Sequence, residues 1–511
     1  MSSKGLVYLV GAGPGDPGLI TVKGLACLQK ADVVIYDRLV SSALLRQAPR
    51  GCEMIDAGKS PQGHTLAQEA INALLVEKAL AGKVVVRLKG GDPFLFGRGG
   101  EEAEALAEAG VPFEVVPGVT SAIAAPAYAG IPVTHRDHTS AFAVVTGHED
   151  PTKADSSLDW QKLATGVGTL VLLMGVGNLS QIVAKLIEHG RDVQTPVAIV
   201  QQGTEARQKT VTGTLGDIVE KAREADIKPP AVTIVGEVVR LREKLRWFDT
   251  KPLFGKRVLV TRSREQASAL SQRLRELGAE PLEYPAIEIA PPKDIAPLDE
   301  TIARLATYDW LIFTSANGVG AFVDRMSEKG LDIQALGRPK IAAIGPATAQ
   351  ALADCGLRVD YLPKVYTTEE IAAGIGDVSG QRILLPRAER APKRLAQALR
   401  GKGAAVDEVA AYRTLAVGAP DELKALLADG QIDIVTFTSS STVGNLVASL
   451  QGATPANVLS RCLVACIGPV TARTAARLGI RVDVVAREHT IAGLVEAIVT
   501  AVTERGRDDE R

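Results

Sequence analysis

Residues 6–37 read LVYLVGAGPGDPGLITVKGLACLQKADVVIYD, and the order of elements in this stretch sets the architecture of the chain. A β-rich run at 6–10 is followed by a glycine-rich turn, a helical stretch at 18–29 and a second β-rich run at 32–36. Strands and helices that alternate in this way form parallel sheets covered by helices. The same alternation continues along the chain, so we predict an α/β protein.

The composition allows several compact domains and gives no sign of a nucleic-acid or membrane partner. The chain has 511 residues, of which 46% are hydrophobic and 23% charged, and its 58 Lys+Arg against 59 Asp+Glu leave a net charge of -1. A balanced charge provides no general field for a phosphate backbone. The apolar runs are shorter than the roughly 18 residues of a membrane helix, and a signal peptide is not apparent, so we expect a cytoplasmic protein. The five cysteines form no CxxC pair, which predicts buried thiols and no metal site.

Breaks in the pattern predict the domain boundaries. A charged helical pattern ends at 249–256, where Pro and Gly precede a new strand, and we place the main linker there. We divide the first half, 1–248, into parts at about 1–115 and 116–248. We divide the second half, 257–505, into one lobe at about 287–412 and another made of 257–286 plus 413–505, and we expect the charged tail 506–511 to be frayed.

An internal repeat in the second half supports two similar lobes. FTSANGV at 313–319 returns as FTSSSTV at 437–443, and AIGPATA at 343–349 returns as CIGPVTA at 466–472. Each copy reads as a strand, a Thr/Ser-rich turn and a helix, which presents hydroxyls and free N–H groups at a helix N-terminus. A single copy would be a plain helix cap, but two copies facing one cleft predict an anion-binding site.

The glycine-rich turn of the first half could form a loop that holds some other ligand, or it could begin the dinucleotide-binding fold of an oxidoreductase. Its glycines let the backbone approach a ligand closely, and Asp37 ends the next strand, where a dinucleotide fold places its ribose-binding acid. Against a dinucleotide-dependent oxidoreductase, Asp16 occupies the third Gly position of GxGxxG, and Pro14 and Pro17 stiffen the loop.

Several further motifs resemble one family. They are YDRLVS at 36–41, RLKGGDPFLFGRGGEE at 87–102, VPGVTSA at 116–122, GIPVTHR at 130–136 and VVTGH at 144–148. Together they resemble the tetrapyrrole methylase family, specifically its uroporphyrinogen-III methyltransferases, over residues 5 to 248. The resemblance implies that S-adenosyl-L-methionine is the methyl donor and S-adenosyl-L-homocysteine the product. It also implies that the cofactor is held by Pro14, Gly90, Gly91, Asp92, Leu95, Thr120, Ser121, Met174 and Gly203.

The same resemblance implies the catalytic groups. A pyrrole carbon would attack the sulfonium methyl, with Asp37 as proton acceptor and Lys59 as proton donor. Because uroporphyrinogen III carries eight carboxylates, we expect Arg38, Arg98, His135 and Arg136 to bind them. Without the resemblance, Lys59 reads as a surface lysine, Arg98 as a solvated loop residue and Met174 as core filling.

The second half resembles uroporphyrinogen-III synthase from about 255 to 505. The motifs in order are VTR at 260–262, FTSANG at 313–318, IGPATA at 344–349, LPR at 385–387, YRT at 412–414 and FTSS at 437–440. The resemblance implies two α/β lobes joined by crossing strands near 284–289 and 410–415. The candidate substrate-binding residues are Thr314, Ser315, Asn317, Thr348, Thr438, Ser439 and Thr471. Tyr412 is our candidate for assisting hydroxyl departure, although it also suits a packed hinge strand.

These resemblances predict a bifunctional enzyme. It would close hydroxymethylbilane to uroporphyrinogen III with loss of water, and then methylate that product twice, at C2 and C7, to give precorrin-2. The alternative is an active methyltransferase followed by a non-catalytic tetrapyrrole-binding module. The methylase resemblance also implies a homodimer formed through the first half.

Overall fold

The computed structural model describes residues 5–49, 51–58, 66–147, 158–261, 264–284, 287–331, 339–416, 420–450 and 454–509. The chain folds into two compact units, one made mostly of residues 1–258 and the other mostly of 282–497. In the described ranges, four five-stranded sheets with helices on their faces make up the fold, so the predicted α/β class is confirmed. Within the same ranges, no helix is long and apolar enough to cross a membrane.

The first sheet is entirely parallel and has the order β3-β2-β4-β1-β5. Its strands are β1 (Leu6–Gly11), β2 (Val33–Tyr36), β3 (Glu53–Asp56), β4 (Val84–Lys89) and β5 (Phe113–Val116). A dinucleotide fold places its first and second strands side by side, whereas β4 separates β1 from β2 here. In addition, the glycine-rich turn leads into a short 3-10 helix, Pro17–Leu19, before α1 begins at Val22. The strand order therefore argues against the oxidoreductase interpretation.

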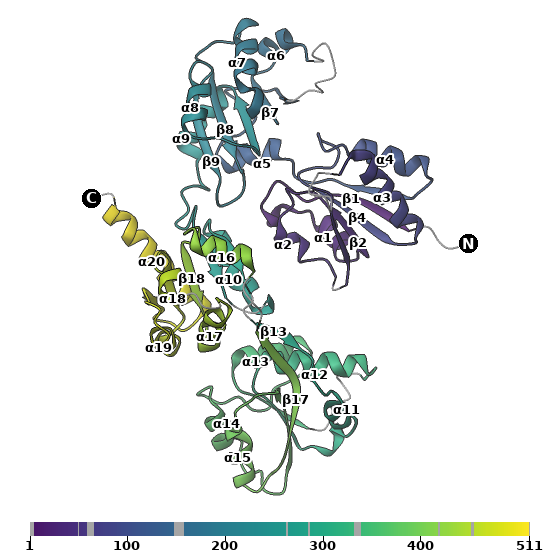
Figure 1. Ribbon diagram of the computed structural model, residues 1–511, viewed down its shortest axis with the longest axis vertical. Coiled ribbons are helices and arrows are strands. Elements are labelled where there is room, and N and C mark those ends of the chain that lie inside the picture. The colour runs from purple at the N-terminus through teal and green to yellow at the C-terminus, as the bar shows by residue number, and fades with distance from the viewer. Residues whose placement is uncertain are drawn as a thin grey trace. The chain divides into compact units, whose positions relative to one another are not determined.

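Helices cover both faces of the first sheet, as strand alternation requires. Val7 and Leu9 pack against α3 (Gln68–Leu80) and α4 (Gly99–Glu108), whereas Val10 packs against α1 (Val22–Leu28) and α2 (Ser42–Leu45). Figure 1 shows these two pairs of helices on opposite sides of the strands. Because both faces are buried, the strands are almost continuously apolar, as in other parallel sheets.

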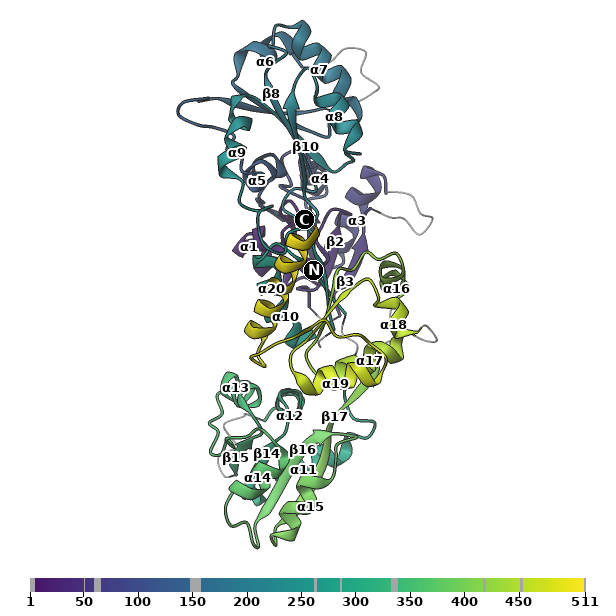
Figure 2. The same cartoon turned by 90° about the vertical axis from the view of Figure 1, so that its left-hand side faces the viewer.

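The second sheet is mixed and has the order β6-β7-β10-β8-β9. Its strands are β6 (Phe142–Thr146), β7 (Thr169–Leu173), β8 (Pro196–Gln201), β9 (Lys209–Thr214) and β10 (Ala231–Val235). One face packs on α6 (Trp160–Gly166), α7 (Leu179–Glu188) and α8 (Ile218–Glu224), and the other on α5 (Ser121–Tyr128) and the 3-10 helix Glu237–Leu241. Figure 2 shows the strands between α7 and α8 on one side and α5 on the other. The helix α5 follows the last strand of the first sheet along the chain, but it packs in the core of the second sheet.

The second half contains the two lobes that the repeat predicts. One sheet has the order β12-β11-β18-β19-β20 and the other β13-β17-β16-β14-β15. The strands of the first are β11 (Arg257–Val260), β12 (Glu280–Glu283), β18 (Ile434–Phe437), β19 (Leu463–Cys466) and β20 (Val484–Val485). Those of the second are β13 (Ile287–Ala290), β14 (Trp310–Phe313), β15 (Lys340–Ala343), β16 (Arg382–Ala388) and β17 (Ala405–Ala416). The segments that we expected to cross between lobes pair with each other, because β13 lies antiparallel to the last residues of β17.

The helices of the second half complete its layers. They are α10 (Arg264–Glu276), α11 (Ala296–Ala303), α12 (Ala316–Glu328), α13 (Pro346–Asp354), α14 (Thr368–Gly374), α15 (Arg394–Gly401), α16 (Asp421–Ala428), α17 (Ser440–Ser449), α18 (Pro455–Val458), α19 (Pro469–Arg477) and α20 (Ile491–Asp509). Both copies of the repeat form a strand, a turn and a helix, as predicted: β14 leads to α12, and β18 leads to α17. The duplication extends to hydrogen bonds. Asp360 accepts from Ile341 N at 2.8 Å, and Asp483 accepts from Val464 N at 2.9 Å.

Candidate functional site

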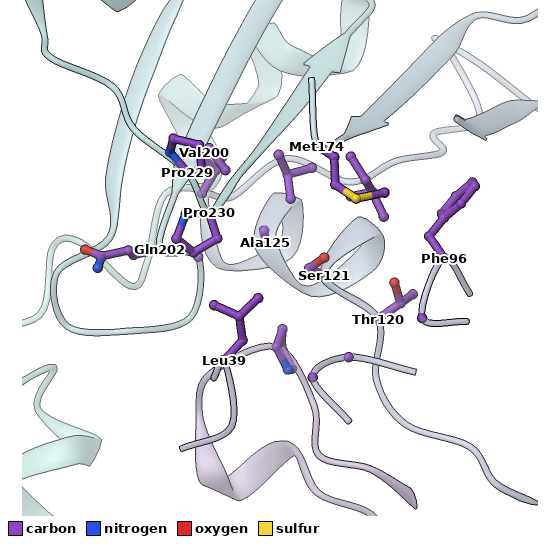
Figure 3. Close-up of a pocket in the computed structure, with 18 of the residues that line it drawn as sticks. Leu39, Phe96, Thr120, Ser121, Ala125, Met174, Val200, Gln202, Pro229 and Pro230 are labelled. Atoms are coloured by element: carbon purple, nitrogen blue, oxygen red, sulfur yellow. The ribbon is translucent and has the colours of Figure 1, made fainter. Parts of the chain in front are cut away.

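A cavity of about 400 Å³ lies where the strand ends of the first sheet meet those of the second. The first sheet contributes the loops after β1, β2 and β4 and the start of α5, and the second contributes the ends of β7 and β8 and the start of β10. In Figure 3, Met174 and Leu39 lie on opposite sides of this cavity, with Ser121 between them. Its size suits a small-molecule ligand.

All nine residues that the sequence predicts for cofactor binding line this one cavity. They are Pro14, Gly90, Gly91, Asp92, Leu95, Thr120, Ser121, Met174 and Gly203. These residues lie between positions 14 and 203 of the sequence, so only the tertiary structure brings them to one place. Which ligand atoms they contact stays a prediction.

Close backbone packing explains one glycine in the cavity wall, Gly91, and a second glycine, Gly118, that packs against it. A Cβ on Gly118 would lie 2.2 Å from the carbonyl oxygen of Gly91, and Gly91 itself has a φ of +69°. Asp92 fastens the same loops, because its carboxylate accepts hydrogen bonds from Gly118 N at 2.9 Å and from Phe94 N at 2.8 Å. The Gly-Gly-Asp motif therefore shapes the wall with its backbone, and its carboxylate is already engaged by main-chain donors.

Several residues that line the cavity have a strained backbone conformation. Phe96, Met174 and Gln202 line it, and each has a left-handed conformation, with φ values of 53°, 57° and 47°. For residues other than glycine such conformations cost about 1 kcal/mol or more and are common at functional sites. Met174 is also 53% exposed, so it does not fill a core. This conformation favours the binding interpretation of Met174 over the packing interpretation.

Polar contacts that the sequence did not reveal tie the two sheets together beside the cavity. The hydroxyl of Tyr128 donates to Asp16 Oδ2 at 2.8 Å, and the backbone N–H of Asp16 donates to Thr204 Oγ1 at 3.0 Å. Burial, with the hydrogen bond to Asp16, raises the pKa of Tyr128, so its phenol stays a neutral donor. Asp16, at the third glycine position of the dinucleotide pattern, thus links the loop after β1 to α5 and to the loop after β8.

The predicted catalytic and carboxylate-binding residues of the first half are only partly brought together. Arg38 lines the cavity, and Asp37 precedes it at the end of β2. Arg98 follows the lining residue Gly97, and it forms a bidentate ion pair with Glu101 at 2.8 and 2.7 Å, which lowers the pKa of Glu101.

Two of the predicted carboxylate-binding residues, His135 and Arg136, do not line the cavity. His135 and Arg136 lie in a turn closed by a bridge between His135 and Thr139. Lys59, together with His148 of the VVTGH motif, lies outside the described residues.

In the second half, the predicted hydroxyl residues stand at equivalent helix starts. Ser315 caps α12 by accepting from Gly318 N at 3.0 Å, and Ser439 caps α17 by accepting from Thr442 N at 3.3 Å. Thr314, Asn317 and Thr438 beside them are half-buried. Thr348 and Thr471, in the first turns of α13 and α19, are only 3% and 5% exposed, which leaves little of either residue for a ligand. Tyr412 reaches one of these sites, since its hydroxyl lies 3.1 Å from Ser315 Oγ.

Two aromatic residues at equivalent positions in the two lobes extend the duplication beyond the repeated motifs. A Cβ on Gly345, at the start of α13, would lie 3.4 Å from the side chain of Tyr366, and one on Gly468, at the start of α19, would lie 3.1 Å from His489. Each aromatic residue is followed by a threonine whose hydroxyl accepts from a helix N–H. In the sequence, an aromatic residue followed by threonine occurs at 366–367 and again at 489–490, and this recurrence could have revealed that the two segments are equivalent.

Fold and site define an α/β protein with a small-molecule cavity between two sheets in its first half and a duplicated, two-lobed second half. Residues 6–219 match the family model for tetrapyrrole (corrin/porphyrin) methylases, and residues 268–496 match that for uroporphyrinogen-III synthase HemD. "Porphyrin biosynthesis protein HemD" of Ruminiclostridium josui is 42% identical over 97% of this chain and 98% of its own. The chain therefore belongs to the tetrapyrrole methylase family through its first half and to the uroporphyrinogen-III synthase family through its second.

Other relatives match the first half alone. The uroporphyrinogen-III C-methyltransferase of Priestia megaterium is 57% identical over 46% of this chain and 98% of its own. A solved structure of uroporphyrin-III C-methyl transferase from Thermus thermophilus, complexed with S-adenyl homocysteine, is 43% identical and covers 46% of this chain and 94% of that one, with a TM-score of 0.40.

Proposed function

We propose that this protein is a bifunctional enzyme of tetrapyrrole synthesis. Its second half would close hydroxymethylbilane to uroporphyrinogen III with loss of water. Its first half would methylate uroporphyrinogen III at C2 and C7 to give precorrin-2, with S-adenosylmethionine as the methyl donor. The observation that carries the proposal is the meeting of nine predicted cofactor residues in one cavity of a chain that belongs to both families.

The chemistry of the cavity wall fits S-adenosylmethionine. Backbone groups around Gly91 and the hydroxyls of Thr120 and Ser121 could bond the polar groups of the cofactor, and Met174 could offer it a soft apolar contact. When bound, the cofactor supplies an electrophilic methyl group. The residues of the chain then have to align the acceptor carbon, exclude water and remove a proton.

We assign proton removal to Asp37 and carboxylate binding to Arg38. Asp37 directly follows β2, and the exposed fraction of its side chain is 33%, so its carboxylate is reachable from solvent. Arg38 lines the cavity and carries a permanent positive charge that can pair with an acidic macrocycle. Lys59, Arg98, His135 and Arg136 remain predictions from the resemblance.

For the second half, we propose that hydroxyl groups hold the folded substrate and that Tyr412 helps the hydroxyl group to leave. The Tyr412 hydroxyl lies 3.1 Å from Ser315 Oγ at the start of α12, so a donor and a helix N-terminus meet at one point. A phenol there can donate to a departing hydroxyl, and the helix start favours the substrate's carboxylates. The hydroxyl leaves as water with a proton from Tyr412, and the pyrrole carbon that forms the new bond releases a proton that can return to the phenolate, so this half needs positioning and proton transfer without a redox step.

The test uses the full chain with two substrates. Given hydroxymethylbilane without S-adenosylmethionine, we expect isomer III above the spontaneous background of isomer I. Given uroporphyrinogen III and methyl-labelled S-adenosylmethionine, we expect two labels in each product molecule. Labelled product without any gain of isomer III would leave a methyltransferase with a binding module, and failure of both assays would refute the proposal. We extend the proposal to a cytoplasmic location and to a homodimer formed through the first half. Light scattering of the full chain would check whether it is a dimer.

A further inference from the structure

A group of four charged side chains, Arg87, Lys89, Glu102 and Asp37, lies next to the loops that line the cavity, since Asp37 precedes the lining residue Arg38 and Lys89 precedes the lining residue Gly90. Glu102 is fully buried, and the side chains of Arg87 and Lys89 are only 2% and 3% exposed. Such residues are rarely buried to this degree unless they are paired. Of the four, only Asp37 has a role in the proposed function, so the cofactor contacts do not explain this buried arrangement.

Glu102 anchors both cations. Its Oε1 accepts from Arg87 Nε at 2.9 Å and from Lys89 Nζ at 2.8 Å, and Gln68 Nε2 lies 3.3 Å from the same oxygen. Within the described residues, Oε2 of Glu102 has no hydrogen-bond partner. The carboxylate is thus committed to the buried cations, and it ties the first turn of α4 to β4.

Arg87 extends from this anchor to Asp37. One end of its guanidinium bonds Glu102 through Nε, while NH1 donates to the carbonyl of Ile35 at 3.3 Å and NH2 donates to Asp37 Oδ1. The planar guanidinium is therefore held at three points, two of them on β2 or directly after it. This fixed fork therefore restrains the Asp37 carboxylate through its Oδ1 atom.

Charge balance makes Asp37 part of the group. Two buried cations face a single buried carboxylate, so Asp37 supplies the second negative charge. An imbalance of buried charge is costly, so Asp37 belongs to the group through its charge as well as through its contact with Arg87. Burial and the nearby charge of Arg87 lower the pKa of Lys89, as expected where positive charges crowd together.

We propose that Arg87, anchored by Glu102, is a positioning residue that orients the Asp37 carboxylate toward the substrate during methyl transfer. The inference rests on the proposed function, in which Asp37 accepts a proton. It differs from a purely structural ion pair in one respect: the effect of Arg87 on turnover must pass through Asp37.

A double-mutant cycle tests this dependence on the full-length protein. Arg87→Lys keeps the charge but removes the planar fork, and we expect kcat for methyl transfer to fall about 10- to 100-fold, the usual effect of a misplaced catalytic group. The KM for S-adenosylmethionine and the Kd for S-adenosylhomocysteine should change less than about twofold, because neither Arg87 nor Asp37 lines the cavity. In an Asp37→Asn background, the same substitution should change kcat less than about twofold, since its target is already lost.

Arg191→Lys is the matched control. Arg191 is likewise an arginine held at several points, but by the backbone carbonyls of Ala164, Val167 and Gly168 under the second sheet. Its replacement should lower the unfolding midpoint without changing kcat. If Arg87→Lys does not fold, Glu102→Gln takes its place, because glutamine keeps the acceptor oxygen while it removes the anchoring charge, and kcat should again fall only when Asp37 is present.

Two kinds of result overturn the inference. The first is an unchanged kcat in the Arg87 and Glu102 variants of an active enzyme, and the second is an equal loss of kcat with and without Asp37. In both cases the proposed function stands. A wild-type chain that transfers no methyl group overturns the proposed function itself, and the inference falls with it.

Discussion

Replacing Gly203 by alanine is expected to damage the cavity, because the added methyl group has no room. A Cβ at Gly203 would lie 2.5 Å from Ala125 Cβ and 3.0 Å from Ala125 Cα. Carbon atoms pack at about 3.5–4.0 Å, so α5 would have to move by about 1 Å. Overpacking of this kind costs about 1–3 kcal/mol of folding free energy. Because Thr120 and Ser121 stand at the start of α5, the shift should also weaken S-adenosylmethionine binding, by about tenfold for each 1.4 kcal/mol of binding free energy lost.

Gly177 provides the matched control for this substitution. It lines the same cavity, yet a Cβ on Gly177 would meet no atom within 4 Å. We expect Gly177→Ala to leave the unfolding free energy unchanged or slightly raised. Urea unfolding gives the stability of each variant, and calorimetric titration with S-adenosylhomocysteine gives its affinity. Equal stability and equal affinity for the two variants would refute the packing argument, since both place a methyl group in the same cavity wall.

Three further predictions follow from other contacts. Tyr128→Phe removes the 2.8 Å hydrogen bond to Asp16, and urea unfolding should show a loss of about 1 kcal/mol; an unchanged midpoint would mean that this bond does not hold the two sheets together. Tyr412→Phe should reduce formation of isomer III from hydroxymethylbilane more than Ser315→Ala does, because only the first removes the proposed proton donor; the reverse order, measured by chromatography of the isomers, would assign the main role to the helix cap. Burial raises the pKa of Cys462 to about 11 and that of Cys466 to about 12, from an ordinary 9.0. The folded state thus retains protons that the unfolded chain releases, so this stabilisation is complete below about pH 9 and is lost as the pH rises toward 11 and 12. Urea unfolding at pH 8 and pH 10.5 should therefore show a smaller loss for a chain with both cysteines changed to alanine than for the wild type, and equal losses would contradict the burial argument.

The synthase half illustrates how a repeat carries information that single motifs lack. Ser315 and Ser439 belong to copies of one short pattern, and both cap helices after parallel strands, as their sequence context predicts. Thr348 and Thr471 also repeat, but they are buried in their lobes. The pattern of residues reports that two positions are equivalent. It does not report whether their hydroxyls face solvent, because this depends on helices packed from other parts of the chain.

The sequence by itself determined the α/β class, the alternation of strands and helices and the duplication in the second half, and the resemblance of its motifs to a family pointed to nine of the residues that line the cavity. These features depend on local periodicity, on glycine where backbones meet, and on motifs that stay together along the chain. Only the tertiary structure decided the strand order β3-β2-β4-β1-β5, the tie from Asp16 to Tyr128 and the buried network that joins Glu102 and Arg87 to Asp37. The physical reason is that the burial and pairing of a charged side chain depend on segments that are distant in the sequence and pack against it only in the folded chain. Arg87 therefore looks like any strand-end arginine until β2 and α4 enclose it.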